Sequence, residues 1–304
     1  MINLQEDPRE FHIETDALRA TVRKRDYITG ILGGTFLDKA TGTTDSCYAL
    51  AMFDFLMAPG WREDHYLKDA AFHGDLPKHI VEGPQICTQV PQIPQEVIRG
   101  RGHLAVRMSF TFTEAGEGYR AGSRWEQTLL FLPGKRYVLV GDTVTSVNDV
   151  DCLFYRLDMP GHIKHNRADT FRQVYLSYHG TIPATEFLAD FPPDGRFLYR
   201  RDESAIPDRF IRAYQSPAGP WLAGMTLDPA APCEAWCHQR GYVCFIQENH
   251  GRPVKRGERF GAAYVVGYFD SIEQMNEVYD LYKGTRHLLV DESGYLPVQT
   301  IPQD

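Results

Sequence analysis

Residues 103–145 read HLAVRMSFTFTEAGEGYRAGSRWEQTLLFLPGKRYVLVGDTVT. Three runs in this stretch alternate apolar and polar side chains, and segments rich in Gly or Pro separate them: His103–Thr113, Arg124–Leu132 and Arg136–Thr145. Alternation with a period of two is typical of β-strands with one buried face. Consecutive strands joined by short turns form a meander, which is an antiparallel arrangement. The stretch therefore predicts an antiparallel sheet.

The rest of the chain extends this strand pattern on both sides. Further strands are predicted at Leu18–Arg23, Tyr48–Met57, Asp151–Leu157, Trp221–Leu227, Glu234–Gln247 and Phe260–Phe269. We see no internal repeat and no linker that would divide the chain. The sequence predicts an all-β protein, built as a large antiparallel two-sheet supersandwich. We expect a single domain over residues 1–304, with its core at about 15–290.

One helix is predicted, near the C-terminus. Ser271 and Gln274 have the spacing of a capping box. Apolar residues then recur at helical spacing from Ile272 to Tyr282, and Gly284 is suited to the residue that ends a helix.

Length, composition and charge narrow the classes of function. The chain has 304 residues, of which 43% are hydrophobic and 24% charged, and its formal net charge is -8. A chain of this length buries enough apolar surface to fold without a disulfide or a metal, and its negative charge opposes nucleic-acid binding. The longest apolar run, Tyr48–Pro59, contains Asp54 and is far shorter than the roughly 20 residues of a membrane helix. We therefore expect neither a nucleic-acid partner nor membrane association.

The N-terminal residues and the cysteines indicate a compartment. Residues 1–11, MINLQEDPREF, have neither the basic start nor the apolar core of a signal peptide. The six cysteines are scattered through apolar or strand-like runs, which fits reduced thiols. We expect a cytoplasmic protein.

The order of the strand segments resembles that of a known superfamily. An early strand leads into GGTFLDKATG (Gly33–Gly42), the meander RWEQTLLFLPGKRYVLVGDTVTSVND (Arg124–Asp149) follows, and more strands close the chain. Over roughly residues 15–270 this pattern resembles the galactose-mutarotase-like β-supersandwich proteins, which are carbohydrate-acting enzymes and domains. The resemblance implies two large antiparallel sheets with a concave sugar-binding face.

The aldose epimerases of that superfamily carry an Asn-His pair followed by aromatic residues. Here Asn249-His250 is followed by Gly251-Arg252-Pro253, so the motif is absent. No catalytic residue of the superfamily is assigned to this chain on the basis of the resemblance.

Residues 152–180, CLFYRLDMPGHIKHNRADTFRQVYLSYHG, are the densest in groups that titrate. His162 and His165 follow the strand-breaking Pro160-Gly161, and histidine is the natural general base near neutral pH. The alternative is that both histidines are solvated residues of a loop.

The same segment offers the other groups that removal of a proton beside a sugar carboxylate requires. Lys164 or Arg167 would neutralise the carboxylate, and Tyr175 or Tyr178 would protonate the leaving oxygen. The alternative for Tyr175 is packing within a strand.

A second histidine-containing segment is HGDLPKHIVEG (His73–Gly83). His79 could act in catalysis, and it stands three residues before Glu82, a spacing found in carboxylate–histidine metal sites. Together with His162 and His165, these two residues are candidate ligands of a divalent metal, which would polarise a sugar carbonyl or carboxylate. The alternatives are a surface loop and a protein without any cofactor.

A third candidate lies in EAWCHQR (Glu234–Arg240). Alternation along a strand places Trp236, His238 and Arg240 on one face. These residues supply a ring for stacking on a sugar, an imidazole, and a guanidinium that can pair with a carboxylate. They are predicted to bind substrate together with Lys164; the alternative is packing at a sheet edge.

These features predict a carbohydrate-active enzyme of the lyase or epimerase type, which acts on a sugar acid or oligosaccharide by proton abstraction. One alternative is a glycoside hydrolase or a metal-assisted sugar lyase. The other is a sugar-binding protein without catalytic activity. In each case the expected partner is a carbohydrate ligand.

Overall fold

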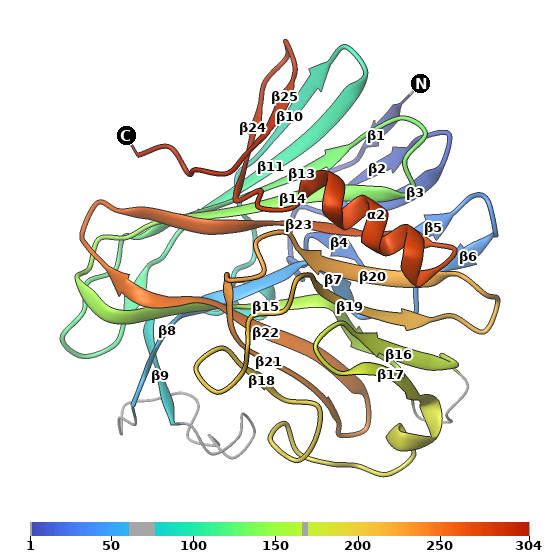
Figure 1. The fold of residues 1–304 in the computed structure, drawn as a ribbon. Coiled ribbons are helices and arrows are strands. Elements are labelled where there is room, and N and C mark those ends of the chain that lie inside the picture. Colours follow the sequence, from blue (N-terminus) through green and yellow to red (C-terminus); the bar gives the residue numbers. More distant parts are fainter. Residues whose placement is uncertain (1, 61–76, 166–169, 304) are drawn as a thin grey trace.

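A computed structural model describes residues 2–60, 77–165 and 170–303 (Figure 1). Two large antiparallel sheets face each other across a common core, and a smaller sheet is built by the N-terminal residues. The predicted all-β supersandwich is therefore confirmed.

The nine-stranded sheet contains the predicted meander. In spatial order its strands are β10 (Gln95–Gly100), β11 (His103–Thr111), β13 (Arg124–Phe131), β14 (Tyr137–Thr145), β23 (Arg259–Phe269), β20 (Trp221–Thr226), β19 (Phe210–Gln215), β16 (Gln173–Leu176) and β17 (Gly180–Pro183). Strands β11, β13 and β14 are adjacent and antiparallel, so the meander is confirmed.

We call the second large sheet the facing sheet. In spatial order its strands are β12 (Glu114–Ala115), β9 (Lys78–Gly83), β8 (Met52–Pro59), β15 (Val150–Ile163), β22 (Val243–Val254), β21 (Pro232–Gln239) and β18 (Tyr199–Arg200). All of its neighbouring strands pair in antiparallel fashion.

The N-terminal sheet consists of β1 (Asn3–Glu6), β2 (Glu10–Glu14), β3 (Leu18–Arg23), β4 (Ile31–Leu32), β5 (Leu37–Asp38), β6 (Thr43–Thr44) and β7 (Ala49–Leu50). A C-terminal hairpin follows, with strands β24 (His287–Val290) and β25 (Tyr295–Val298). Figure 1 shows this hairpin alongside β10 and β11.

In the described residues the helical elements are α1 (Ile86–Gln89), a 3-10 turn η2 (Ala184–Phe187) and α2 (Ile272–Tyr282). Helix α2 is the predicted C-terminal helix: Ser271 accepts a hydrogen bond from the backbone N–H of Gln274, and Gly284 has a positive φ of 85°. Neither α-helix in the described part of the chain has the length and apolar character that a membrane span requires.

The nine-stranded sheet has one apolar core on each of its two faces. The main core fills the space between the two large sheets, where the hydroxyl groups of Tyr155 and Tyr264 are 2.6 Å apart. A second core lies beneath α2, which runs across the nine-stranded sheet (Figure 1). Helix α2 contributes Met275 and Tyr279 to this core.

The facing sheet turns its other side away from the main core, and we call this side the outer face. It carries two small apolar clusters, one around Phe55 and Phe154 and one around Trp236 and Ile246. Between them lie ionisable side chains, most of them buried: Asp54, Lys78, Arg156, Asp158, His162, Glu234, His238 and Glu248. Buried charges of this kind need partners.

Candidate active site

The first part of the site is an ion pair within β15. Between Asp158 and Gly161 this strand gains residues relative to β22, and the resulting bulge places His162 over Asp158. The Nε2 atom of His162 lies 2.9 Å from Oδ2 of Asp158. Burial is the largest single influence and lowers the pKa of His162, but the Asp158 carboxylate, Cys244 and the hydrogen bonds to both together outweigh it and raise this pKa well above its usual value. The Asp158 carboxylate thus favours the protonated imidazole.

Asp54 of β8 supplies a second carboxyl group to the same region. Alternation along β8 places Phe53 in the main core and Asp54 on the outer face, and the register of β8 against β15 shifts immediately after Phe53. The Oδ1 atom of Asp54 accepts hydrogen bonds from Gln85 Nε2 at 2.8 Å and from the Cys87 thiol at 3.1 Å. Burial, and then the charge of Asp158, raise the pKa of Asp54 to about 6. This carboxyl group therefore changes between its protonated and ionised forms close to neutral pH.

His238 has the opposite protonation state to His162. It lies on β21, directly opposite Cys244 of β22. Burial, and then the positive charges of His162 and Arg240, lower the pKa of His238 to about 4. At neutral pH the outer face thus holds one imidazole that can donate a proton and another that can accept one.

A buried ion-pair network occupies the neighbouring part of the outer face. The Lys78 ammonium lies 2.8 Å from Glu234 Oε2 and 2.7 Å from Glu248 Oε2. Arg156 binds the other oxygen of Glu248 at 2.9 Å. The Trp236 ring lies beside both cations, with Lys78 Nζ 4.9 Å and the Arg156 guanidinium carbon 5.5 Å from its centroid. Burial raises the pKa of Glu234 against the opposing charge of Lys78.

A cavity of about 390 Å³ opens beside this network. Lys78, Glu234 and Glu248 line it on the charged side, and Phe154, Cys152 and Cys233 on the apolar side. Its volume lies within the range of small-molecule sites. The cavity reaches the Lys78 network, whereas His162 is not among its lining residues.

An aromatic rim borders the Asp158–His162 pair. The ring centroids of Tyr242 and His162 are 5.1 Å apart, and Tyr48 contacts Tyr242 edge-on at 5.8 Å. Tyr48 is 40% exposed, and the Lys164 ammonium lies 4.8 Å from its ring centroid. Exposed tyrosines offer both a flat apolar surface and a hydroxyl, the combination that stacks on sugar rings.

Several of the predicted site residues come together in the structure. His162, Trp236 and His238 all lie on the outer face of the facing sheet, and the pairing of β21 with β22 confirms the predicted alternation for Trp236 and His238. Lys164 lies at the aromatic rim. Arg240, the residue after β21, is exposed and close enough to His238 to lower its pKa.

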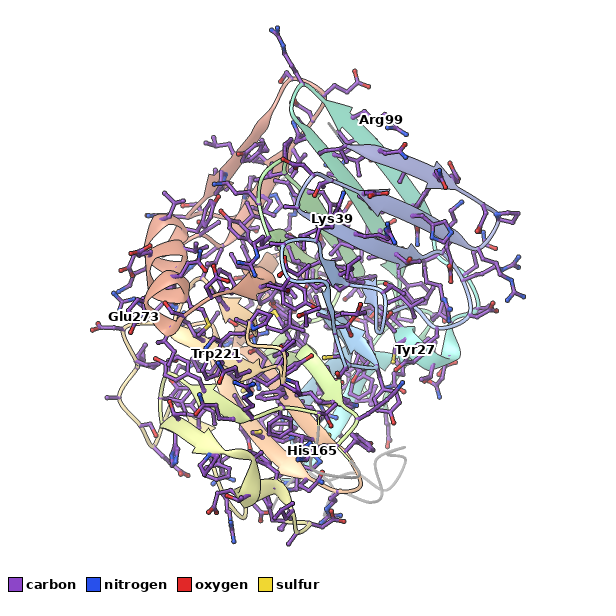
Figure 2. The ribbon with its side chains drawn as sticks, turned by 90° about the vertical axis from the view of Figure 1, so that its right-hand side faces the viewer. Tyr27, Lys39, Arg99, His165, Trp221 and Glu273 are labelled. Carbon is purple, nitrogen blue, oxygen red and sulfur yellow. The ribbon has the colours of Figure 1, made fainter. Side chains whose placement is uncertain are left out.

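His165 does not join this group. Its ring stacks on Phe171 with centroids 4.0 Å apart, and its Nδ1 lies 3.0 Å from Thr170 Oγ1. Phe171 belongs to the main core, so His165 is packed inward, whereas His162 remains on the outer face. Figure 2 shows His165 near the end of the molecule opposite Arg99 of β10.

The two predicted proton donors, Tyr175 and Tyr178, also lie elsewhere. Tyr175 is on β16 of the nine-stranded sheet and contacts Trp221 edge-on at 6.4 Å. Tyr178 stacks on Phe210 with centroids 5.3 Å apart, beside the main core. Neither tyrosine has a ring contact with His162, because the chain leaves the facing sheet after β15 and continues in the nine-stranded sheet.

His79 and Glu82 both lie on strand β9, and each forms hydrogen bonds with neighbouring segments of the protein. His79 Nδ1 lies 2.8 Å from the Gly60 carbonyl, and its Nε2 lies 3.2 Å from the Tyr119 hydroxyl. Glu82 accepts hydrogen bonds from the backbone N–H of Ser123 at 2.9 Å and from the Asn148 amide at 2.8 Å. The other two residues named in the sequence analysis, His73 and Arg167, lie outside the described residues.

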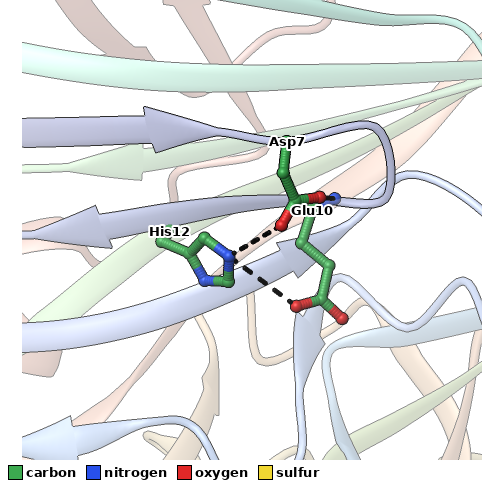
Figure 3. Close-up of side chains that lie close together, drawn as sticks. All are labelled: Asp7, Glu10 and His12. Carbon is green, nitrogen blue, oxygen red and sulfur yellow. Dashed lines mark hydrogen bonds and ion pairs between the residues drawn. The ribbon is translucent and has the colours of Figure 1, made fainter.

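The four candidate metal ligands His79, Glu82, His162 and His165 do not converge in the described part of the chain. There, the one group of three His, Cys, Asp or Glu ligand atoms within 4.8 Å of one another belongs to Asp7, Glu10 and His12 (Figure 3). This group lies on the β1–β2 hairpin, where the Asp7 carboxylate accepts the backbone N–H groups of Arg9 and Glu10. The Asp7 carboxylate is thus occupied in holding the turn, and the Glu10 carboxylate pairs with Arg23.

Asp54, Asp158 and the Lys78 network were not among the residues that the sequence indicated. A signal for Asp54 was present, because it is the one ionisable residue in the apolar run Tyr48–Pro59. Asp158 likewise stands within a run of apolar strand residues. A charged residue in such a run requires a buried partner, and that requirement would have identified both carboxylates.

No protein-family model and no curated protein sequence matches this chain. Solved structures do match. A galactose 1-epimerase from Lactobacillus acidophilus NCFM covers 89% of this chain and 99% of its own, with a TM-score of 0.52 and 11% identity.

Two further matches are to longer proteins. A GH36 alpha-galactosidase, AgaB, from Geobacillus stearothermophilus covers 94% of this chain, with a TM-score of 0.48 and 9% identity. A TPR-domain containing protein from Parabacteroides distasonis ATCC 8503 covers 86%, with a TM-score of 0.48 and 9% identity. This chain spans 44% and 47% of their lengths, respectively. From the epimerase match and its own two facing antiparallel sheets, we conclude that the chain has the galactose-mutarotase-like β-supersandwich fold.

Proposed function

We propose that this protein is a carbohydrate-active enzyme that transfers protons on a sugar or sugar acid bound over the outer face of the facing sheet. The observation that carries the proposal is the pairing of two histidines with opposite protonation states. His162 is held protonated by Asp158, while His238 is kept neutral by burial and its positive neighbours. Groups whose environments push their pKa values apart are suited to act as acid and base in one reaction.

The proposed reaction uses each histidine once. His238 is fully buried in the structure, so in this proposal substrate binding must open the outer face above it. His238 then accepts the proton from the sugar carbon beside a carboxylate or carbonyl, and the electron pair of the broken C–H bond enters a new double bond. In a lyase, this breaks the C–O bond to the leaving group, and His162 donates its proton to the departing oxygen. In an epimerase, a proton returns to the opposite face of the same carbon. Arg240, which is exposed at the end of β21, pairs with the carboxylate of the substrate.

The carbohydrate class of the substrate is supported by two features. Of the three solved structures described above, the one with the highest TM-score is a galactose 1-epimerase, so a protein that acts on a sugar has a similar fold. The tyrosines at the rim beside His162 offer stacking surfaces that suit a sugar ring.

A glycoside hydrolase is the second candidate, and one observation favours it. Glu234 and Glu248 both bind the Lys78 ammonium, so their carboxylates lie close together beside the 390 Å³ cavity. Glycosidases use a pair of carboxyl groups, one as acid and one as base or nucleophile.

The experiment is an assay of purified protein against uronate-containing oligosaccharides, with and without a chelator. Lyase cleavage leaves a conjugated double bond, so absorbance in the ultraviolet should rise. We expect His162→Ala and His238→Ala to reduce the rate at least about 100-fold, in line with loss of a general acid or base. His12→Ala, at a half-buried histidine on the β1–β2 hairpin, should retain the wild-type rate.

The same panel is followed by NMR in D₂O to detect epimerisation, which incorporates deuterium at a sugar carbon without changing absorbance. New reducing ends without either signal would indicate hydrolysis and would favour Glu234 and Glu248 as the catalytic pair. Binding without any reaction would indicate a sugar-binding protein and would refute the proposal.

A further inference from the structure

A second cavity lies on the other side of β22 from the candidate active site. It has a volume of about 350 Å³ and opens between the β22–β23 turn region and the C-terminal residues 299–303. Its lining includes Arg252, Arg286, His250, Phe260 and Asp228. The reaction proposed above uses none of these residues.

The charges around this cavity are not balanced. Arg286 forms an ion pair with Asp228, with Nε 2.7 Å from Oδ2. Arg252 and the neighbouring Arg201 have no carboxylate within 4.0 Å among the described residues, and both instead donate to the carbonyl of Ala230, at 3.3 and 2.8 Å. The lining itself holds three arginines, Arg252, Arg259 and Arg286, against two acids, Asp228 and Glu258, so it carries a positive charge although the chain as a whole has a net charge of -8.

The electrostatics of the cavity reflect this excess of positive charge. Burial, followed by the charges of Arg201 and Arg286, lowers the pKa of Arg252. Burial and the charge of Arg252 likewise lower the pKa of His250 to about 4, which keeps its imidazole neutral. An anion placed here would relieve the repulsion among the arginines.

His250 adds a second, independent observation. Its ring packs on Phe260 with centroids 4.5 Å apart, and its Nε2 atom is buried without a hydrogen-bond partner in the described part of the chain. Its φ of 80° is a left-handed conformation that residues with a Cβ rarely adopt. Unpaired buried polar atoms and strained backbone are both concentrated at binding sites.

We propose that this cavity is a binding site for an oxyanion carried by a ligand of about monosaccharide size. Arg252 and Arg286 bind the phosphate, sulfate or carboxylate group, and Nε2 of His250 forms a hydrogen bond with the body of the ligand. The volume supports this size, because 350 Å³ lies at the lower end of the range for small-molecule sites and exceeds what a free oxyanion fills. The inference does not depend on the proposed function.

The test is isothermal titration calorimetry of the full chain at constant ionic strength. The probes are sodium sulfate, inorganic phosphate, glucuronate and glucose 6-phosphate, with glucose as the uncharged control. We expect saturable binding of glucuronate or glucose 6-phosphate and none of glucose. Arg252→Ala and Arg286→Ala should each weaken binding at least about ten-fold, as loss of a charge-assisted hydrogen bond does.

Arg9→Ala is the matched control, because the Arg9 side chain is 73% exposed and lies far from this cavity in the sequence. It should bind like the wild type. Thermal unfolding of each variant separates lost binding from lost folding, and Arg252, which is exposed, can be removed without opening the core. Tighter binding of sulfate or phosphate than of either sugar anion would overturn the proposed ligand size. Absence of saturable binding, or equal binding by the three arginine variants, would overturn the site itself.

Discussion

At the scale of single residues, His162 links the candidate site to the stability of the protein. Its pKa is raised in the folded state, whereas an unfolded chain has the ordinary histidine value of about 6.5. A raised pKa means that the Asp158–His162 pair stabilises the folded state fully below about pH 6.5, and that this contribution is lost as the pH rises through the folded-state pKa. The pair is therefore a pH-dependent element of stability.

The first prediction follows from the upward direction of the pKa shift of His162. We expect His162→Gln to lower the free energy of unfolding by more at pH 6 than at pH 9, measured by urea denaturation at both values. Asp158→Asn should reduce the same pH dependence, because it removes the charge that raises the pKa of His162. A difference between wild type and His162→Gln that grows with pH would contradict the assignment.

The sequence alone could identify residues whose neighbours are local, but not those that depend on distant strands. Alternation along one strand was sufficient to place Trp236 and His238 on a common face. It could not show that Lys78 of β9 meets Glu234 of β21, because 156 residues separate the two. Nor could it separate His162 from His165, since their different directions follow from the bulge in β15 and the packing of Phe171.

At the scale of elements, the irregular part of β15 positions the site. Gly161 has a φ of 95°, and a Cβ at this position would lie 1.8 Å from the Ala49 carbonyl oxygen. Glycine is therefore required both for the backbone conformation and for the close approach of β15 to β7. Gly180 of β17 has a similar φ of 111°, but a Cβ there would meet no atom within 4 Å.

The second prediction compares these two glycines. Gly180→Ala should lower the free energy of unfolding by about 1–2 kcal/mol, through the strain of a positive φ alone. Gly161→Ala should cost about 2 kcal/mol more, because the backbone of β7 must also move. Thermal and urea unfolding of the two variants provide the comparison. Equal losses of stability would show that the contact with Ala49 contributes nothing.

Elements with local signals were predictable, and irregular ones were not. The meander of β11, β13 and β14 and the capped helix α2 follow from alternation, turns and capping within the segment itself. The bulges in β8 and β15 arise where one strand pairs with another that is distant in sequence, and the only local mark is the strand-breaking Pro160-Gly161 in β15. Asp54 and Asp158 lie at these bulges, and although their charge within buried strands indicates a need for partners, the sequence does not show that they share one site.

At the scale of the whole molecule, one buried arginine joins the two large sheets. Arg212 of β19 is fully buried and crosses the main core to the facing sheet. Its guanidinium donates to the carbonyl of Ile246 at 2.7 Å, to that of Met159 at 2.8 Å and to the side chain of Gln247 at 2.9 Å. Met159 and Ile246 lie at the bulge between β15 and β22, where the regular ladder is interrupted. Arg212 thus donates to carbonyl groups on both strands at the bulge.

The third prediction concerns this connection. In Arg212→Met the side chain fills a similar volume but provides no donor, so the carbonyls of Met159 and Ile246 lose their hydrogen bonds. An unsatisfied buried acceptor costs about 1–3 kcal/mol, whereas removal of the buried charge offsets part of that cost. We expect the free energy of unfolding, measured by urea denaturation, to fall by about 3 kcal/mol, and to fall less for Arg212→Lys, which keeps a donor.

Arg19→Met, on a side chain that is 57% exposed, is the control and should change stability little. If Arg212→Met were as stable as the wild type, the cost of burying the guanidinium would equal the value of its hydrogen bonds. The bulge beneath the candidate site would then be held by the facing sheet alone.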